Sequence, residues 1–115
     1  MTVNQAIIDA VTPIVSKVVP DNYNGEEKEY CVFNYTEYPD LYGDDGPTMI
    51  RYSIMLHYFL PLGENPIITK KRIQNALHDA GFTYPSVTNA TDNEYQHYVF
   101  ECEYIDDNVF MEEIT

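Results

Sequence analysis

Tryptophan is absent from this chain, and basic residues are scarce. Six Lys and Arg stand against 19 Asp and Glu, which gives a formal charge of -13 at pH 7, and no basic residue follows Arg72. Such a surface repels phosphate, so the composition disfavours direct binding to nucleic-acid backbones. Three interpretations stay open: an ordinary solvated surface, a surface that must not hold passing DNA, and one that imitates DNA to occupy a basic partner.

Cysteines and long apolar runs are also few. Cys31 and Cys102 both fall inside predicted strands, which is typical of small, buried, reduced side chains and not of a disulfide scaffold. A pair on adjacent strands remains an open alternative. No apolar run approaches the roughly 18 residues of a membrane span, and residues 1–5 lack a basic region before an apolar run. We expect neither a secretion signal nor a membrane-spanning segment.

The length of 115 residues suits one domain, which we place at 1–105, followed by an acidic C-terminal tail at 106–115. An apolar stripe at helical spacing predicts a first helix between Val3 and Val18. Pro13 interrupts that stripe, so we expect a kink or a restart at Thr12.

Strand patterns occupy the middle of the chain. Residues 29–37 are predicted to form a strand whose core face the pattern does not identify. The acidic segment 38–47, with two prolines and two glycines, is predicted to be a long mobile connection. The strict alternation over 49–60 predicts the clearest strand. Its core face is predicted to carry Ile50, Tyr52, Ile54, Leu56, Tyr58 and Leu60.

A second helix and two further strands follow. Asn65 and Pro66 form a helix start and Gly81 a stop, around a buried stripe of Ile73, Ala76, Leu77 and Ala80. Pro85 shortens the next strand, which suits a sheet edge. The last strand is predicted to carry an apolar face made of Tyr98, Phe100, Cys102 and Tyr104.

These elements follow one another in the order α-β-β-α-β-β. Adjacent strands joined by loops should pair antiparallel. We therefore predict an α+β fold with an antiparallel sheet of strands of mixed length and two helices packed on one of its faces.

Candidate chemistry is sparse. The three histidines, His57, His78 and His97, are too far apart for a local metal-ligand spacing, and no HExxH or CxxC motif is present. A site would need His57 and His97 on neighbouring strands, and an enzyme would also need a cysteine in the same pocket. Asp40, Asp44 and Asp45 would attract a calcium ion, but their spacing departs from the EF-hand pattern. We expect no catalytic residue, metal or cofactor, and we expect that the chain is not an enzyme.

Eleven tyrosines suggest a contact surface, because tyrosine offers a broad contact area with a polar tip. The basic residues of the second helix are predicted to lie mostly opposite its buried stripe, either in solvent or against an acidic neighbouring subunit. The candidate interface residues are Tyr38, Tyr42, Asp44, Asp45, Lys70, Lys71, Arg72, Glu101, Glu103 and Phe110.

The stretches KRIQNALHDAGF at 71–82 and YQHYVFE at 95–101 resemble the small tail-completion, or tail-terminator, proteins of long-tailed bacteriophages and prophages. The long strand 49–60 before the helix and the Val19-Pro20 element after the first helix also match. The resemblance covers most of the chain in element order. It implies a structural virion protein that forms a ring, usually six-fold, at the head-tail junction.

In that family the ring caps the tail tube and docks the head connector, so the implied partners are further copies of the chain, the tail-tube protein and the connector. DNA would pass the acidic lumen without specific binding, and no membrane is involved. The implied location is the virion, after assembly in the host cytoplasm. The competing hypothesis, based on charge alone, is an acidic DNA-mimic module that inhibits a nucleic-acid enzyme.

Overall fold

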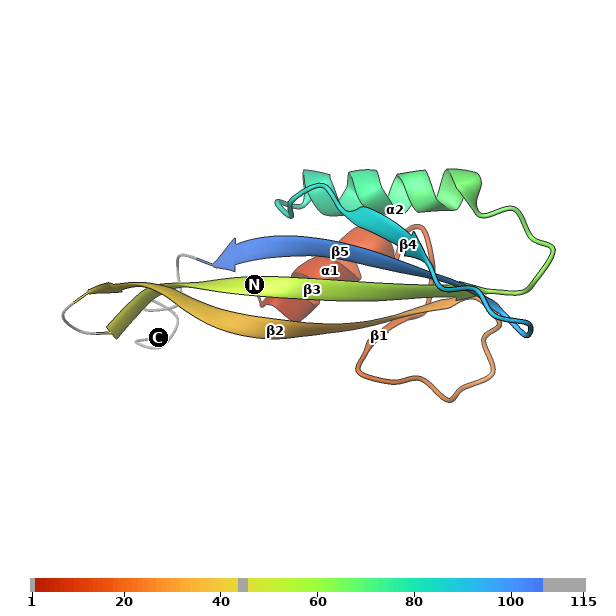
Figure 1. Cartoon of the computed structure of the whole chain (residues 1–115), viewed down its shortest axis with the longest axis horizontal. Helices are drawn as coiled ribbons and strands as arrows, with labels where there is room; N and C mark the ends of the chain where they lie inside the picture. The colour runs from red at the N-terminus through yellow and green to blue at the C-terminus, as the bar shows by residue number, and fades with distance from the viewer. Residues whose placement is uncertain (1, 44–45, 107–115) are drawn as a thin grey trace.

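Within residues 2–43 and 46–106, which the computed structural model describes, two helices and a five-stranded sheet form an α+β fold (Figure 1). At 40–43 and 46–48 only the backbone is described. The elements are α1 (Val3–Val11), β1 (Val18–Pro20), β2 (Tyr30–Gly43), β3 (Gly46–Leu60), α2 (Ile67–Asp79), β4 (Ser86–Asn89) and β5 (Gln96–Asp106). The strand order is β1-β2-β3-β5-β4.

The sheet is mixed, which corrects the prediction of a wholly antiparallel one. β1 pairs with β2 in parallel, whereas every other neighbouring pair among the described strands is antiparallel. The N-terminal segment is the cause: α1 ends at Val11, and the chain turns and returns as β1. Pro13 has no N–H with which to continue the helix, so the predicted interruption at Thr12 is its end. Val18, predicted to be helical, pairs with Cys31 instead.

The predicted mobile connection at 38–47 is wrong. β2 runs on to Gly43 and β3 begins at Gly46, and the two strands pair from Tyr30 opposite Phe59 to Gly43 opposite Gly46. Pro39 is tolerated because no described strand flanks β2 at that point, so its missing N–H interrupts no ladder on that side. Tyrosines along this stretch favour extended backbone.

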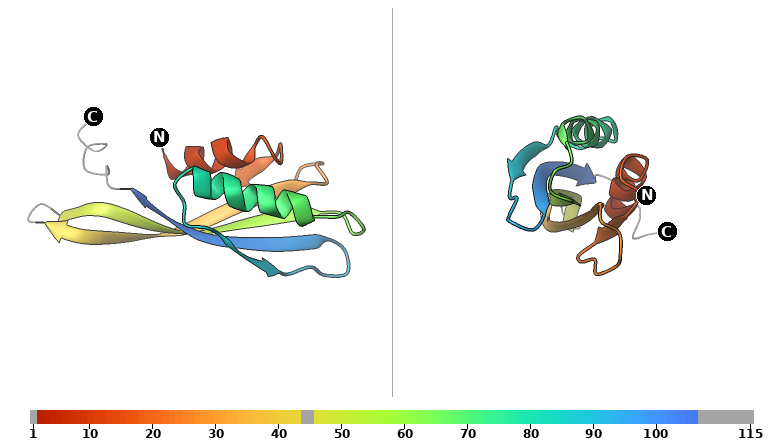
Figure 2. Two further views of the ribbon diagram at one scale, coloured as in Figure 1. Left: turned by 90° about the horizontal axis from the view of Figure 1, so that it is seen from above. Right: turned by 90° about the vertical axis from the view of Figure 1, so that its right-hand side faces the viewer.

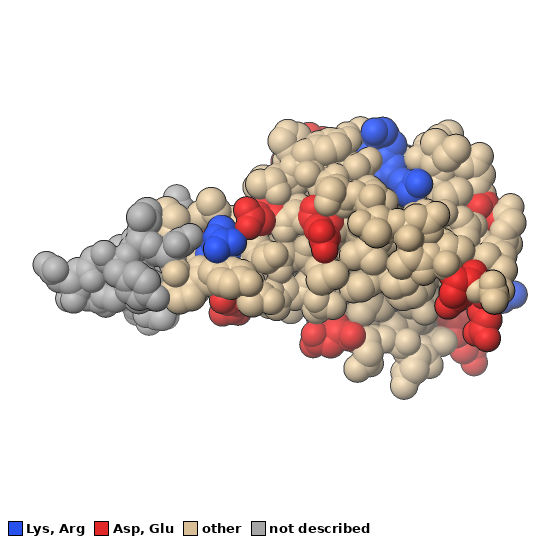
Figure 3. Space-filling model, in the orientation of Figure 1, with Lys and Arg blue, Asp and Glu red and all other residues tan. Residues whose placement is uncertain are grey.

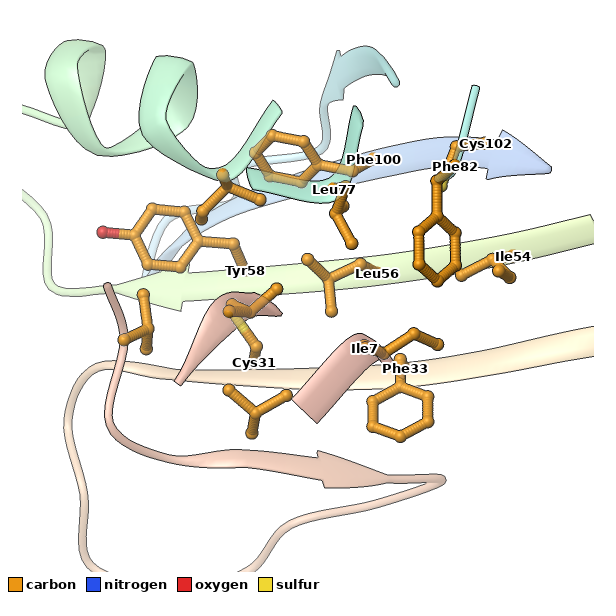
Figure 4. Close-up of a cluster of buried hydrophobic side chains, with 14 of the residues drawn as sticks. Ile7, Cys31, Phe33, Ile54, Leu56, Tyr58, Leu77, Phe82, Phe100 and Cys102 are labelled. Atoms are coloured by element: carbon orange, nitrogen blue, oxygen red, sulfur yellow. The ribbon is translucent and has the colours of Figure 1, made fainter. Parts of the chain in front are cut away.

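A single core lies between the helices and one face of the sheet (Figure 4). The predicted core face of β3 is confirmed, with Ile54, Leu56 and Tyr58 fully buried. Cys31 and Phe33 identify the core face of β2, which the sequence pattern left open. Each large side chain buried here contributes on the order of 1.5–3 kcal/mol.

Both helices cover that same face, as predicted (Figure 2). The α1 residue Asn4 accepts a 2.7 Å hydrogen bond from the hydroxyl of Tyr35 on β2, and Ile7 of the same helix is fully buried. From α2, Ile73 and Leu77 are fully buried, whereas Ala80, placed in the predicted stripe, is exposed.

The boundaries of α2 follow the predicted start and stop. Asn65 Oδ1 accepts a 3.0 Å hydrogen bond from the Ile67 N–H, and Gly81 has a φ of 102°. This left-handed conformation costs glycine little, so it ends the helix. The short β4 lies after Pro85 at the edge of the sheet, beside β5, as predicted.

The molecule is elongated, with extents of 54 × 25 × 23 Å. β5 ends at Asp106, opposite Ile50, whereas β2 and β3 continue beyond it as a two-stranded ribbon (Figure 1). We call the ribbon formed by residues 40–43 and 46–49 the hairpin arm. No helix in the described part of the chain is long and apolar enough to cross a membrane.

Candidate functional site

The face of the sheet opposite the helices, here called the outer face, carries the side chains that core packing does not use. Strand residues alternate between faces, so register assigns each one. Successive rows across β2, β3 and β5 are Tyr30-Phe59-His97, Val32-His57-Val99, Asn34-Met55-Glu101, Thr36-Ser53-Glu103 and Tyr38-Arg51-Ile105. This face is turned to the viewer in Figure 3, where uncharged atoms cover most of it and acidic side chains are scattered.

The outer face brings together the two histidines that a site would require. Nδ1 of His57 and Nε2 of His97 lie 2.8 Å apart. The two residues are diagonal neighbours, because His57 is opposite Val99 and His97 is opposite Phe59. Phe59 stacks on the His97 ring with 4.3 Å between centroids. In this pair one ring donates its proton to the other, so at least one imidazole is neutral.

Burial is the main cause that lowers the pKa of both histidines below the ordinary 6.5. The charge of His57 lowers the pKa of His97 further, whereas Asp92 acts to raise it. Both rings are therefore mostly neutral at pH 7, with lone pairs available. This is the protonation state that a metal ligand or a hydrogen-bond acceptor needs.

An open hollow of about 370 Å³ lies over the histidine pair. The segment after β1 forms one wall, where Glu27 N–H donates a 2.9 Å hydrogen bond to the hydroxyl of Tyr23. Tyr95 donates its hydroxyl proton to the Lys28 carbonyl, which ties this segment to the start of β5. The hollow is lined by Asp21, Asn22, Tyr23, Tyr30, Val32, Asn34, His57, Phe59 and His97.

The cysteines do not join the histidines. Cys31 and Cys102 are free and buried on the core face, and β3 separates their strands, so the alternative of a pair on adjacent strands is wrong. Burial, and then Glu103, raises the pKa of Cys102 to about 12, and burial, followed by Glu29, raises that of Cys31. Neither thiol supplies a thiolate at neutral pH, so no Cys–His nucleophile forms here.

A second cluster lies on the outer face at the base of the hairpin arm. Arg51 Nη1 is 2.8 Å from Glu103 Oε2, and the Arg51 guanidinium lies 4.5 Å from the centre of the Tyr38 ring. The structure thus joins two predicted interface residues through Arg51, which the sequence analysis did not single out. Its lone positive charge within β3 was the available signal.

The basic residues of α2 lie on a different part of the molecule. Lys71 and Arg72 are exposed, as predicted, but Lys70 is half-buried with its Nζ 4.4 Å from the centre of the Tyr98 ring. Glu101 is exposed on the outer face. The predicted interface residues therefore divide between the sheet and the helix layer.

Several predicted residues lie outside what the structure describes. Asp44, Asp45 and Phe110 are not among the described residues, and neither is the tail from 107 onwards. Tyr42 belongs to β2, with only its backbone described, and the same holds for Asp40. The calcium alternative on this acidic segment therefore stays a hypothesis.

In the described ranges no three or more His, Cys, Asp or Glu side chains gather as a metal-binding group. Comparisons of the chain with protein-family models and with curated proteins find no match.

Proposed function

We propose that this chain is a structural virion protein of a long-tailed phage, which forms a homo-oligomeric ring at the head-tail junction, caps the tail tube and docks the head connector. The observation that carries the proposal is the hairpin arm, a ribbon that extends past the last residue of β5 and away from the helix-covered body. A projecting ribbon suits contact with a neighbouring subunit better than it suits binding of a small substrate.

Open strand edges add support. β1 pairs with β2 only at Cys31, Val32 and Phe33, so no described strand flanks β2 from Asn34 onwards. β5 likewise accompanies β3 only from Ile50. Unpaired edges of this kind accept a strand from another chain through backbone hydrogen bonds.

The acidic charge supports a ring whose lumen DNA passes through without binding. The formal charge of -13 opposes phosphate binding over the whole molecule. In a ring the lumen would be acidic, and DNA would slide through it without binding. The residues that contact neighbouring subunits would come from the arm and from Tyr38, Lys71, Arg72 and Glu101. The resemblance of 71–82 and 95–101 to tail-completion proteins supports the ring in particular.

Light scattering coupled to size separation tests the ring, at high protein concentration and with tail-tube protein added. We expect a closed oligomer, most simply a hexamer, under at least one of these conditions. A strict monomer under both would contradict the proposal.

A shortened arm tests the contact. Replacing residues 40–49 with Asn-Gly joins Pro39 to Ile50 through a favoured hairpin sequence. We expect loss of the oligomer with an unchanged unfolding midpoint of the body, because the core lies elsewhere. A second variant, Lys71→Glu with Arg72→Glu, separates a contact through α2 from one through the arm. Full assembly of both variants would refute these contact surfaces.

The charge also motivates the competing DNA-mimic hypothesis. A mimic binds basic DNA-binding proteins with an affinity that falls steeply as salt rises. Binding of this kind by the monomer, without a ring, would favour the mimic over the virion protein.

A further inference from the structure

We propose that His57 and His97 form a two-histidine binding site for one divalent transition-metal ion of the Zn²⁺, Ni²⁺ or Cu²⁺ class. The site is on the outer face, in the floor of the hollow described above, and it is independent of the ring proposal.

The spacing of the two ring nitrogens fits the proposal. Metal–imidazole bonds are about 2.0–2.1 Å long, so two nitrogens at neighbouring positions of a square-planar or octahedral ion lie about 2.9 Å apart, and at a tetrahedral ion about 3.3 Å apart. Nδ1 of His57 and Nε2 of His97 are already 2.8 Å apart. An ion would replace the shared proton, and both rings would turn so that their lone pairs point at the ion instead of along the line between the two nitrogens.

The strands hold both ligands in place before any ion arrives. His57 is on β3 and His97 on β5, two strands that pair from Ile50–Asp106 to Leu60–Gln96. Phe59 stacks on the His97 ring. Binding an ion therefore requires little ordering of the chain, which keeps the entropic cost low.

The surroundings favour a cation and leave room for further ligands. Asp21 lines the hollow, and the negative charge of Asp92 acts on His97. Because no third protein ligand gathers there among the described residues, water or a group from a partner molecule would complete the coordination. Open positions of this kind are typical of metal sites that bind a further ligand. Metal selectivity should follow imidazole chemistry, with Cu²⁺ bound most tightly and Mg²⁺ or Ca²⁺ not bound by the pair.

Isothermal titration of the full chain with ZnCl₂ and NiCl₂ at pH 7.5 tests the site. We expect one ion per chain, and a loss of affinity of about tenfold or more in His57→Gln and in His97→Gln, because each removes one of two ligands. The matched control is His78→Gln on α2, whose Nδ1 lies 3.2 Å from the Phe82 carbonyl oxygen and outside the hollow. This control should bind like the parent chain.

NMR of the unsubstituted chain decides the question even if a variant fails to fold. Substoichiometric Zn²⁺ should shift the ring resonances of His57 and His97 and leave those of His78 unchanged, whereas Mg²⁺ at the same concentration should shift neither of the paired rings. Equal Zn²⁺ affinity in the parent chain and in both pair variants would overturn the proposal. So would Zn²⁺ shifts confined to carboxylates or to His78, because the acidic surface alone would then explain the binding.

Discussion

The two faces of the sheet differ in what determines their composition. On the core face of β3, Ile54, Leu56 and Tyr58 are fully buried, and each is replaceable only at the expense of packing. On the outer face, the residues between them are Met55, which is 36% exposed, and His57, which is half-buried. Burial limits which residue types the core face can carry. On the outer face, what matters is which side chains the pairing of the strands makes neighbours.

The largest effect should come from a deletion on the core face. Leu56→Ala removes a fully buried side chain between Phe33 and Phe100, so we expect a loss of about 2–5 kcal/mol in the free energy of unfolding. The neighbouring outer-face variant Met55→Ala should change it by less than about 1 kcal/mol. Urea denaturation followed by circular dichroism measures both, and similar losses in the two variants would remove the distinction between the faces.

An intermediate effect should come from the histidine pair and should depend on pH. Burial lowers the pKa of His57 and His97 in the folded chain below the ordinary 6.5, so below pH 6.5 the unfolded chain binds more protons than the folded one. Their contribution to stability is therefore intact above about pH 6.5 and is lost as the pH falls through the folded-state pKa values.

The comparison of the parent chain with His57→Gln isolates this contribution from that of the carboxylates. Stability should fall more steeply with decreasing pH in the parent chain than in the variant, as measured by urea denaturation between pH 7.5 and 5. Asp21 and Asp92 are the acids that face the pair, and hydrogen bonds from the N–H groups of Glu94 and Tyr95 lower the pKa of Asp92. Asp92 thus stays charged in this range, and parallel curves for the two proteins would argue against the predicted titration.

The smallest effect should come from the ion pair at the base of the arm. Glu103→Gln removes the negative charge that lies 2.8 Å from Arg51, and both side chains are partly exposed. We expect a loss below about 1 kcal/mol that shrinks further in 0.5 M salt. Glu101→Gln, one row away on the same face, is the control and should be neutral. A loss of several kcal/mol for Glu103→Gln alone would mean that the fold depends on this ion pair for its stability.

Sequence patterns identified the core faces of β3 and α2 because burial leaves a local periodic signal. The alternation from Tyr52 to Leu60 and the stripe of Ile73 and Leu77 both predicted buried residues correctly, whereas Ile50 is only partly buried. The segment 38–47 was misassigned because prolines, glycines and acids usually indicate loops, whereas here the pairing with β3 keeps the chain extended. Val18 was misassigned because an apolar residue suits a helix or a buried strand equally well.

The candidate site depended on register, which sequence did not supply. His57 and His97 are 40 positions apart, and only the pairing of Phe59 with His97 makes their rings meet. A shift of one residue would send one ring to the core. Arg51 was likewise missed, because its contacts with Tyr38 and Glu103 come from two other strands.

The pairing of Gly43 with Gly46 has a consequence for the order in which the sheet folds. Residues so close in sequence meet without closing a long loop, so β2 and β3 can zip from this end, one residue pair at a time. β5 must instead wait for a loop that contains α2 and β4. The arm would then form early, before β5 joins the sheet, in addition to the contact role proposed for it.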